Sequence, residues 1–336
     1  MKLQPTSLIK QHAPLFEGAC LADLPAFRCA HAHDAEKGTG CTVVIAPEGA
    51  TCSVAVRGGG PATRETDLLK PENTIEAVHA VVLAGGSAFG LAASTGVMEE
   101  LRRHAIGFEI AGTRVPIVTG ACLFDLLVGE HAYPDAAIGA HAAQTALSDD
   151  SPDLAEGNVG AGCGATVGKM LGPDHAMKTG FGIYGLRKGP LVVVALVAVN
   201  AVGTVVDSHG APLAGHRLPD GTIMDPLAPI GSLTATAAHQ PTTNTTIGVV
   251  LTNAQLTKAQ AEKVSSVTHD AYARAIKPVH TANDGDTVFT FASGEVPAPY
   301  DLVAIMATEA MQGAIERAAT QATDAYGYPS AQTLRS

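Results

Sequence analysis

Hydrophobic positions along the chain follow two different periods, which predict helices and strands in mixed order. Apolar residues recur at helical spacing after Gly85 and Gly86 and continue to the basic run Arg102–Arg103, and the same spacing returns later in the chain. Continuous valine-rich runs predict buried strands instead. The predicted helices cover residues 88–104, 135–147, 256–276 and 301–322, and the predicted strands cover 42–45, 52–56, 191–206 and 245–252.

Local details refine these predictions. The strands at 42–45 and 52–56 are separated by a Pro-Glu-Gly turn, so we expect them to pair with each other. Asn200 interrupts the apolar run at 191–206. The last helix should bury one face, formed by Leu302, Ile305, Met306 and Ala310. The predicted fold class is therefore α/β, without the regular alternation of strands and helices that forms a doubly wound sheet.

Composition limits the kinds of partner. The chain has 336 residues, of which 46% are hydrophobic and 16% charged, and no linker divides it, so we expect one domain over 1–336. A net charge of −11 without a Lys/Arg cluster argues against nucleic acid as a partner. The amino terminus lacks the apolar run of a signal peptide, and the longest apolar stretch, 191–199, is too short to span a bilayer. We therefore expect a cytoplasmic protein without membrane association.

Six cysteines occur without a C-x-x-C pair, which predicts free and mostly buried thiols. The histidines of His31-Ala-His33-Asp34 could hold a metal, but no second cluster completes the ligand set, and we expect ordinary surface histidines. Near Asp284, an apparent calcium loop has histidine and alanine where the first oxygen ligands belong. The sequence therefore implies no metal.

Two glycine-rich segments resemble phosphate-binding loops only in part. Residues 160–165 fit the dinucleotide pattern, but no apolar strand precedes them and no acidic residue follows at the ribose distance. Gly168-Lys169 lacks the first glycine and the Ser/Thr of a phosphate loop. Ser87 is one residue away from a nucleophile-elbow pattern, and we expect it to begin a helix after a tight glycine turn.

A threonine-rich segment directly precedes the strand at 245–252. A threonine acts as a nucleophile when a base takes its proton, and its own free α-amine can be that base. Thr245 would gain such an amine if its hydroxyl first attacked the carbonyl of Asn244 and water then cleaved the resulting ester. The alternative is an ordinary polar loop entering a strand.

Several glycine-rich and polar sequence blocks follow one another along the chain. They are Gly85-Gly86-Ser87-Ala88-Phe89-Gly90-Leu91, Gly157-Asn158-Val159-Gly160-Ala161-Gly162, Val199-Asn200-Ala201-Val202-Gly203, Asn244-Thr245-Thr246 and Pro278-Val279-His280-Thr281 with Asp284-Gly285-Asp286-Thr287. Together these blocks resemble the D-aminopeptidase/nylon-oligomer hydrolase family, in the family's order, from about residue 24 to 322. The resemblance implies a four-layer αββα sandwich of the type found in ornithine acetyltransferase. It also implies self-cleavage into subunits 1–244 and 245–336 that stay associated, and a homo-oligomer of four or more cleaved protomers.

The resemblance assigns roles to individual residues. Thr245 matches the nucleophile, Asn244 supplies the carbonyl that is cut, and Asn200 matches the oxyanion-hole asparagine. A neutral amide donor can stabilise a developing alkoxide without adding a buried charge. The competing interpretation of Asn200 is a capped strand end.

Three charged positions and one aromatic position complete the comparison. Lys169 matches a lysine beside the nucleophile, and Asp284 and Asp286 match the two acidic positions of the nylon-type branch. We expect these three to form one charged network, with Lys169 between the carboxylates. A solvated lysine and an exposed Asp-Gly-Asp turn are the alternatives. Phe124 stands where that branch has a tyrosine, so it can contact substrate but has no hydroxyl to donate.

The expected activity is hydrolysis of short peptides or related linear amides through an acyl-Thr245 intermediate, with no metal or organic cofactor. Acyl transfer to an amine is an alternative within enzymes. An uncleaved binding protein that kept the fold is the alternative outside them.

Overall fold

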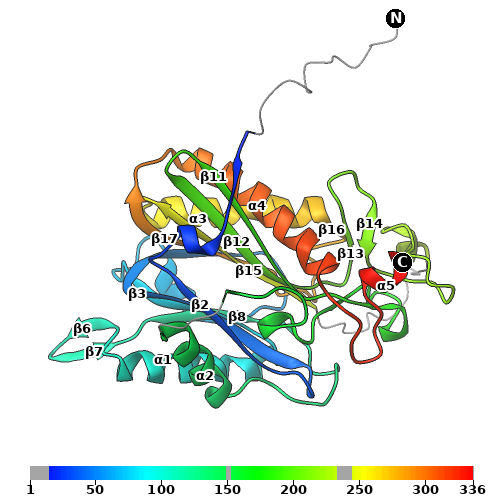
Figure 1. The fold of residues 1–336 in the computed structure, drawn as a ribbon, viewed down its shortest axis with the longest axis horizontal. Helices are drawn as coiled ribbons and strands as arrows, with labels where there is room; N and C mark the ends of the chain where they lie inside the picture. Colours follow the sequence, from blue (N-terminus) through cyan, green and yellow to red (C-terminus); the bar gives the residue numbers. More distant parts are fainter. Residues whose placement is uncertain (1–14, 149–152, 233–243, 336) are drawn as a thin grey trace, which may run out of the picture.

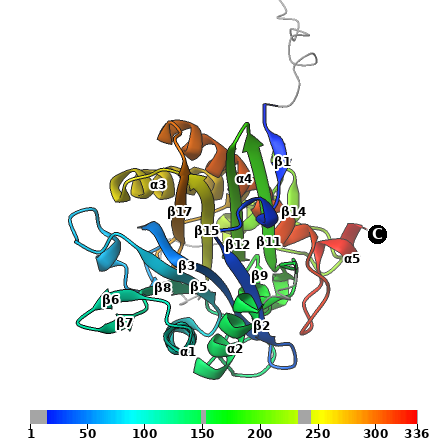
Figure 2. The ribbon, with the colours of Figure 1, turned by 60° about the vertical axis from the view of Figure 1, so that its left-hand side comes forward.

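The computed structural model describes residues 15–148, 153–232 and 244–335, and these form four layers in the order helix, sheet, sheet, helix (Figure 1). Helices α3 (Lys258–Ala275) and α4 (Tyr300–Thr320) cover one side, and α1 (Ala92–Arg103) and α2 (Ala136–Leu147) cover the other. Figure 2 shows the two helix pairs on opposite sides of the strands. The expected four-layer αββα sandwich is confirmed.

The strands of the two inner layers form one hydrogen-bonded path in the order β1-β11-β12-β15-β17-β3-β5-β8-β4, with β2 also paired to β3. Their bounds are β1 Glu17–Ala19, β2 Arg28–Asp34, β3 Thr39–Val56, β4 Ala62–Arg64, β5 Val78–Ala84, β8 Val118–Cys122, β11 Phe181–Lys188, β12 Leu191–Asn200, β15 Thr245–Ala254 and β17 Thr287–Val296. Shorter elements are β6 Phe108–Ile110, β7 Thr113–Val115, β9 Thr166–Val167, β10 Met177–Lys178, β13 Thr204–Val206, β14 Pro212–Ala214, β16 Ile276–Lys277 and α5 Ala331–Arg335.

The long strand β3 joins the two sheets, and here the prediction of two paired strands was wrong. The first part of β3 pairs with β2 and β5, whereas residues 51–56 pair with β17. The Pro-Glu-Gly segment does not reverse the chain. It shifts the register between Ile45 and Ala50, with Gly49 at φ +78°, so the strand continues into the second sheet.

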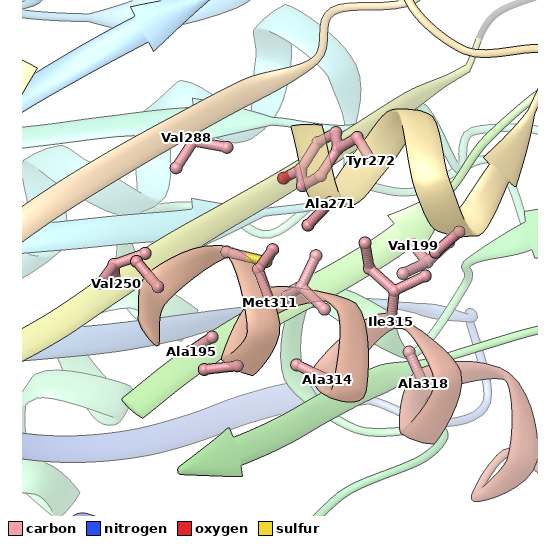
Figure 3. Packing of buried hydrophobic residues seen from close by; sticks show 14 of the residues in the cluster. Ala195, Val199, Val250, Ala271, Tyr272, Val288, Met311, Ala314, Ile315 and Ala318 are labelled. Atoms are coloured by element: carbon pink, nitrogen blue, oxygen red, sulfur yellow. The ribbon is translucent and has the colours of Figure 1, made fainter. Parts of the chain in front are cut away.

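Alternate side chains of β12 bury against different layers. One set packs on α3 and α4, where Ala195 and Val199 face Met311, Ala314 and Ala318 (Figure 3). The other set, which is Val192, Val194, Leu196 and Ala198, lies between the two sheets. A strand that is apolar on both faces therefore lies at the centre of the sandwich, as its unbroken hydrophobic run predicts.

Helix ends agree with the sequence signals. Ser87 begins a short 3₁₀ helix (Ser87–Leu91) that leads into α1, and Asp135 caps α2 by accepting from the backbone N–H of Ile138 at 3.0 Å.

In α4, Met306 and Ala310 are buried as expected, but Ile305 is 54% exposed. The predicted apolar face was therefore wrong at Ile305, because the buried face of α4 is centred on Val303, Ala307 and Ala314 instead.

The six cysteines, all within the described residues, form no disulfide bonds, and all except Cys20 are buried, as expected. His31 differs from its expected place on the surface. Its Nδ1 lies 2.8 Å from the Thr42 hydroxyl, and its ring packs edge-on against Phe181. Burial lowers the pKa of His31 to about 4, so it is a neutral structural histidine at neutral pH.

In the three described ranges, none of the helices is both long enough and apolar enough to cross a membrane.

Candidate active site

Three strand ends meet at one edge of the sheet. β12 ends at Asn200, which lies directly opposite Thr245, the first residue of β15, in the antiparallel register. β17 runs parallel to β15 and begins at Thr287, just after the Asp-Gly-Asp turn. Thr245 belongs to the same alternating set as Ile247, and Asn200 to the same set as Ala198, so both side chains face the space between the two sheets.

Thr245 is enclosed by its immediate neighbours. Its side chain donates a hydrogen bond to the carbonyl oxygen of Asn244 and accepts one from the backbone N–H of Gly285 at 3.0 Å. A Cβ at Gly285 would lie 2.8 Å from the Thr245 hydroxyl, so this approach requires glycine. With the residue only 3% exposed, the hydroxyl is directed at its own preceding peptide group rather than at solvent.

Asn200 is fully buried and uses both ends of its amide. Its Oδ1 accepts from the backbone N–H of Thr166 at 3.0 Å and from Lys169 Nζ at 2.8 Å. Its Nδ2 donates to the carbonyl oxygen of Phe124 at 2.8 Å. Because an amide nitrogen carries two hydrogens, one N–H of Asn200 is left for a further acceptor.

Phe124 therefore reaches the site through its main chain. Its backbone carbonyl accepts the hydrogen bond from Asn200 Nδ2, while its side chain is half-buried. The next residue, Asp125, holds the neighbouring glycine turn by accepting from Gly86 N–H at 2.6 Å and from the Thr39 hydroxyl at 2.9 Å. Burial raises the pKa of Asp125 to about 6.

The side chain of Lys169 forms hydrogen bonds with Asn200. Besides its contact with Oδ1, its ammonium donates to the Asn200 backbone carbonyl at 2.9 Å. Gly168 precedes it at φ +74°, and a Cβ there would lie 2.1 Å from the backbone of Gly215, so only glycine fits this turn. Burial lowers the pKa of Lys169 to about 7, against the opposing effect of the negative charges of Asp284 and Asp125.

The two carboxylates of the Asp-Gly-Asp turn have different partners. Asp286 is fully buried, and its Oδ1 accepts from the backbone N–H of Thr246 at 2.7 Å. Its Oδ2 accepts from the backbone N–H of His280 at 3.1 Å and contacts the ring Nδ1 of the same residue at 2.8 Å. Asp284 accepts from the backbone N–H of Thr281 at 3.1 Å and from its hydroxyl.

The charged network therefore differs from the expected arrangement. Lys169 contacts Asn200 instead of lying between the carboxylates, and the ring of His280 is the partner of Asp286. Lys169 still acts on Asp284 at longer range. Burial and the charge of Asp286 raise the pKa of Asp284 to about 6, while Thr281 and Lys169 oppose that shift.

A glycine-rich loop after β3 also holds the site, and the sequence interpretation did not include it. Gly60 N–H donates to the carbonyl of Asp284 at 2.8 Å, and Arg57 N–H donates to that of Asp286 at 2.9 Å. A Cβ at Gly58 would lie 2.3 Å from the Asp284 carbonyl oxygen. Three consecutive glycines, which follow the strand after Arg57, were the available signal, because they permit such close backbone contact.

A family model described as Peptidase family S58 matches residues 19–328 of the chain. The chain belongs to peptidase family S58. As a member of this family, it is an amide-bond hydrolase.

Curated relatives of this S58 peptidase cover most of its length. An uncharacterized aminopeptidase of Mycobacterium leprae is 42% identical over 293 residues, which are 83% of this chain and 79% of the relative. A 6-aminohexanoate-oligomer endohydrolase of Paenarthrobacter ureafaciens is 32% identical over 286 residues, covering 82% of this chain and 76% of that enzyme.

Solved structures share the fold of this S58 peptidase at low sequence identity. A Burkholderia sp. beta-aminopeptidase has a TM-score of 0.68 and 18% identity, with 99% of this chain and 97% of that chain covered. An L-aminopeptidase D-Ala-esterase/amidase from Ochrobactrum anthropi, described as a variant of the Ntn hydrolase fold, has a TM-score of 0.66 and 16% identity over 90% of this chain and 86% of that one.

Proposed function

We propose that this S58 peptidase cleaves its own chain between Asn244 and Thr245 and then hydrolyses amides with the new amino-terminal threonine. The proposal rests on the position of the Thr245 hydroxyl, which donates a hydrogen bond to the carbonyl oxygen of Asn244. The same hydroxyl accepts from Gly285 N–H. A nucleophile held against the preceding peptide group, and closed off from solvent, is placed for attack on that group before any attack on a substrate.

The cleavage has two steps. In the first, the Thr245 oxygen bonds to the carbonyl carbon of Asn244, the C–N bond breaks, and the proton of the hydroxyl moves to the departing nitrogen, which leaves an ester. In the second, water hydrolyses the ester and gives a carboxylate at Asn244, the free hydroxyl of Thr245 and its free α-amine. That amine then serves as the base when Thr245 attacks a substrate amide.

Before cleavage Thr245 has no free amine, so another base must take its proton. Lys169 is suited to this role because it contacts Asn200, the residue directly opposite Thr245 in the strand pairing, and because its pKa of about 7 leaves a substantial neutral fraction at neutral pH. A neutral amine keeps two N–H groups for its contacts with the carbonyl and Oδ1 of Asn200, and it has one lone pair for the proton. The remaining N–H of Asn200 is suited to stabilise the oxyanion that forms beside it.

The two pieces share one folded core. Residues 245–254 form β15, which pairs with β12 from residues 1–244 on one side and with β17 on the other. α3 and α4, which follow Thr245 in the chain, pack on β12 in the same hydrophobic cluster. A cut before Thr245 therefore leaves this sheet and cluster in place, which supports subunits 1–244 and 245–336 that stay associated.

We extend the proposal to a cytoplasmic homo-oligomer of four or more cleaved protomers. The mass of the assembly, measured by light scattering, gives the number of protomers.

Short peptides and linear amides are the proposed substrates, because the relatives are named as aminopeptidases and as hydrolases of 6-aminohexanoate oligomers. The reaction needs no metal or organic cofactor in this mechanism. Amino acid amides, short peptides and 6-aminohexanoate oligomers should release free amine in proportion to free acid. An added amine acceptor that captured most of the acyl group would instead favour the acyl-transfer alternative.

Asp284 gives a separate prediction that links stability to function. Because burial raises its pKa from 3.8 to about 6, the folded state disfavours the ionised carboxylate, and this cost is fully present above about pH 6. Asp284→Asn should therefore raise the melting temperature at pH 7.5, and the gain should vanish as the pH falls toward 4. It should also slow self-cleavage and catalysis.

The comparison is best made in a Thr245→Ala background, so that both chains stay whole. Glu72→Gln, at an exposed carboxylate, is the control and should leave the melting temperature unchanged at both pH values. A lower melting temperature for Asp284→Asn at pH 7.5 would contradict the assignment of a destabilising buried charge.

A further inference from the structure

His280 contacts the active-site turn through two of its atoms at once. Its backbone N–H and its ring Nδ1 both reach Oδ2 of Asp286, at 3.1 and 2.8 Å. Oδ1 of the same carboxylate accepts from Thr246 N–H at 2.7 Å. The carboxylate therefore joins the His280 side chain to the peptide unit that directly follows Thr245.

The direction of the ring hydrogen bond follows from its partner. An ionised carboxylate can only accept, so Nδ1 of His280 carries the hydrogen. The other ring nitrogen, Nε2, is buried and has no hydrogen-bond partner in the described ranges of the chain. The contact with Asp286 is therefore the hydrogen bond that orients this ring.

Neighbouring rings hold His280 in place without competing for Asp286. The ring of His269 lies edge-on at 4.8 Å between centroids, and that of Tyr272 is stacked at 6.0 Å. His269 directs its Nε2 to the carbonyl of Ala55 at 2.9 Å, and burial lowers its pKa to about 4, so it is neutral at neutral pH. The hydroxyl of Tyr272 donates to the carbonyl of Thr287.

The backbone of His280 adds a second constraint. Its φ of +56° lies in the left-handed region, which is uncommon for residues other than glycine, although histidine, asparagine and aspartate adopt it more often than most. This conformation brings the backbone N–H and the ring Nδ1 to the same oxygen atom. Replacement by a residue that tolerates positive φ but lacks a donor would separate the two contributions.

We propose that His280 is a positioning residue for Thr245, acting through Asp286. Its two N–H groups fix the carboxylate, the carboxylate fixes Thr246 N–H, and that peptide unit sets the direction of the Thr245 hydroxyl. The proposal rests on the function proposed above, because it assigns His280 a part in both self-cleavage and substrate hydrolysis.

A matched pair of variants tests the N–H donor directly. Asparagine and aspartate have nearly the same shape, and both tolerate left-handed backbone, but only His280→Asn puts an N–H where Nδ1 now lies. His280→Asp puts a second carboxylate oxygen against Asp286 instead. His280→Gly tolerates the same backbone conformation and removes the ring donor, while the backbone N–H to Asp286 remains.

Self-cleavage can be followed as the fraction of whole chain over time after cell-free synthesis. His280→Asn should cleave within a few-fold of the wild-type rate, whereas His280→Asp and His280→Gly should be slower by about 10²-fold, the typical cost of a misplaced reacting group. In chains that do become processed, the loss should fall on kcat rather than on KM. Melting temperatures establish that each variant is folded, and if His280→Gly does not fold, the other two carry the test.

Equal cleavage rates for His280→Asn and His280→Asp, whether fast or slow, would overturn the proposal, because ring packing and not N–H donation would then matter. Wild-type cleavage by His280→Gly would overturn it as well. A wild-type chain that stays whole would refute the proposed self-cleavage itself, and the outcomes for the two proposals are therefore distinguishable.

Discussion

Replacement of Thr245 by alanine is expected to leave the protein as one chain of 336 residues and to abolish amide hydrolysis. The hydroxyl that contacts the Asn244 carbonyl is the group that would break this bond and would later attack the substrate, so one substitution removes both reactions. Loss of a nucleophile costs on the order of 10⁶ in kcat in a well-studied hydrolase. A denaturing gel and a hydrolysis assay measure the two effects.

Two control variants separate this effect from a general disturbance of the strand. Thr245→Ser keeps the hydroxyl and should still be processed. Thr246→Val removes a hydroxyl that is buried without a hydrogen-bond partner in the described part of the chain, so it should cost little. A Thr245→Ala chain that still split at this position, or that kept its activity, would exclude Thr245 as the nucleophile.

The second large effect is expected at Asn200. Asn200→Ala should lower kcat by about 10²–10³ while KM changes little, because an oxyanion donor acts mainly in the transition state. Alanine also removes the acceptor of Thr166 N–H and of Lys169, so this variant should lose stability too. Steady-state kinetics of processed enzyme, together with thermal melting, records both consequences.

Asn200→Asp isolates the donor from the acceptor. Aspartate keeps an oxygen for Thr166 and Lys169 but removes the N–H groups, so kcat should fall while more of the stability is retained. It also places an oxygen against the Phe124 carbonyl, which Asn200 now contacts through its Nδ2. Unchanged kcat in a folded and processed Asn200→Ala or Asn200→Asp enzyme would assign Asn200 a structural role alone.

Local patterns in the sequence predicted the elements that carry these residues. The predicted start of a strand at Thr245 coincides with the start of β15. The strand predicted over 191–206 was too long, because β12 ends at Asn200 and residues 204–206 form β13 in a separate sheet. Asn200 and Thr245 are 45 positions apart in the sequence, and they lie opposite each other because β12 and β15 pair in this register. A single sequence does not fix such a register, because it depends on which strands become neighbours.

Contacts between distant segments account for what the sequence did not predict. Gly58 and Gly60 hold the Asp-Gly-Asp turn from the far end of β3, and this requires β3 to pass from one sheet to the other. The pairing predicted for its two halves was wrong, since Pro-Glu-Gly can shift a strand as well as reverse it. Likewise, the family resemblance and the charges of the three residues led us to expect Lys169 between two carboxylates, but its ammonium contacts two oxygens of Asn200 instead.

The central claim is that the chain cuts itself before Thr245, and the mass of the purified wild-type protein tests it most directly. Mass spectrometry under denaturing conditions should find two pieces, residues 1–244 and residues 245–336, with a free threonine at the amino terminus of the second. An active protein that remains a single whole chain after prolonged incubation would contradict the account.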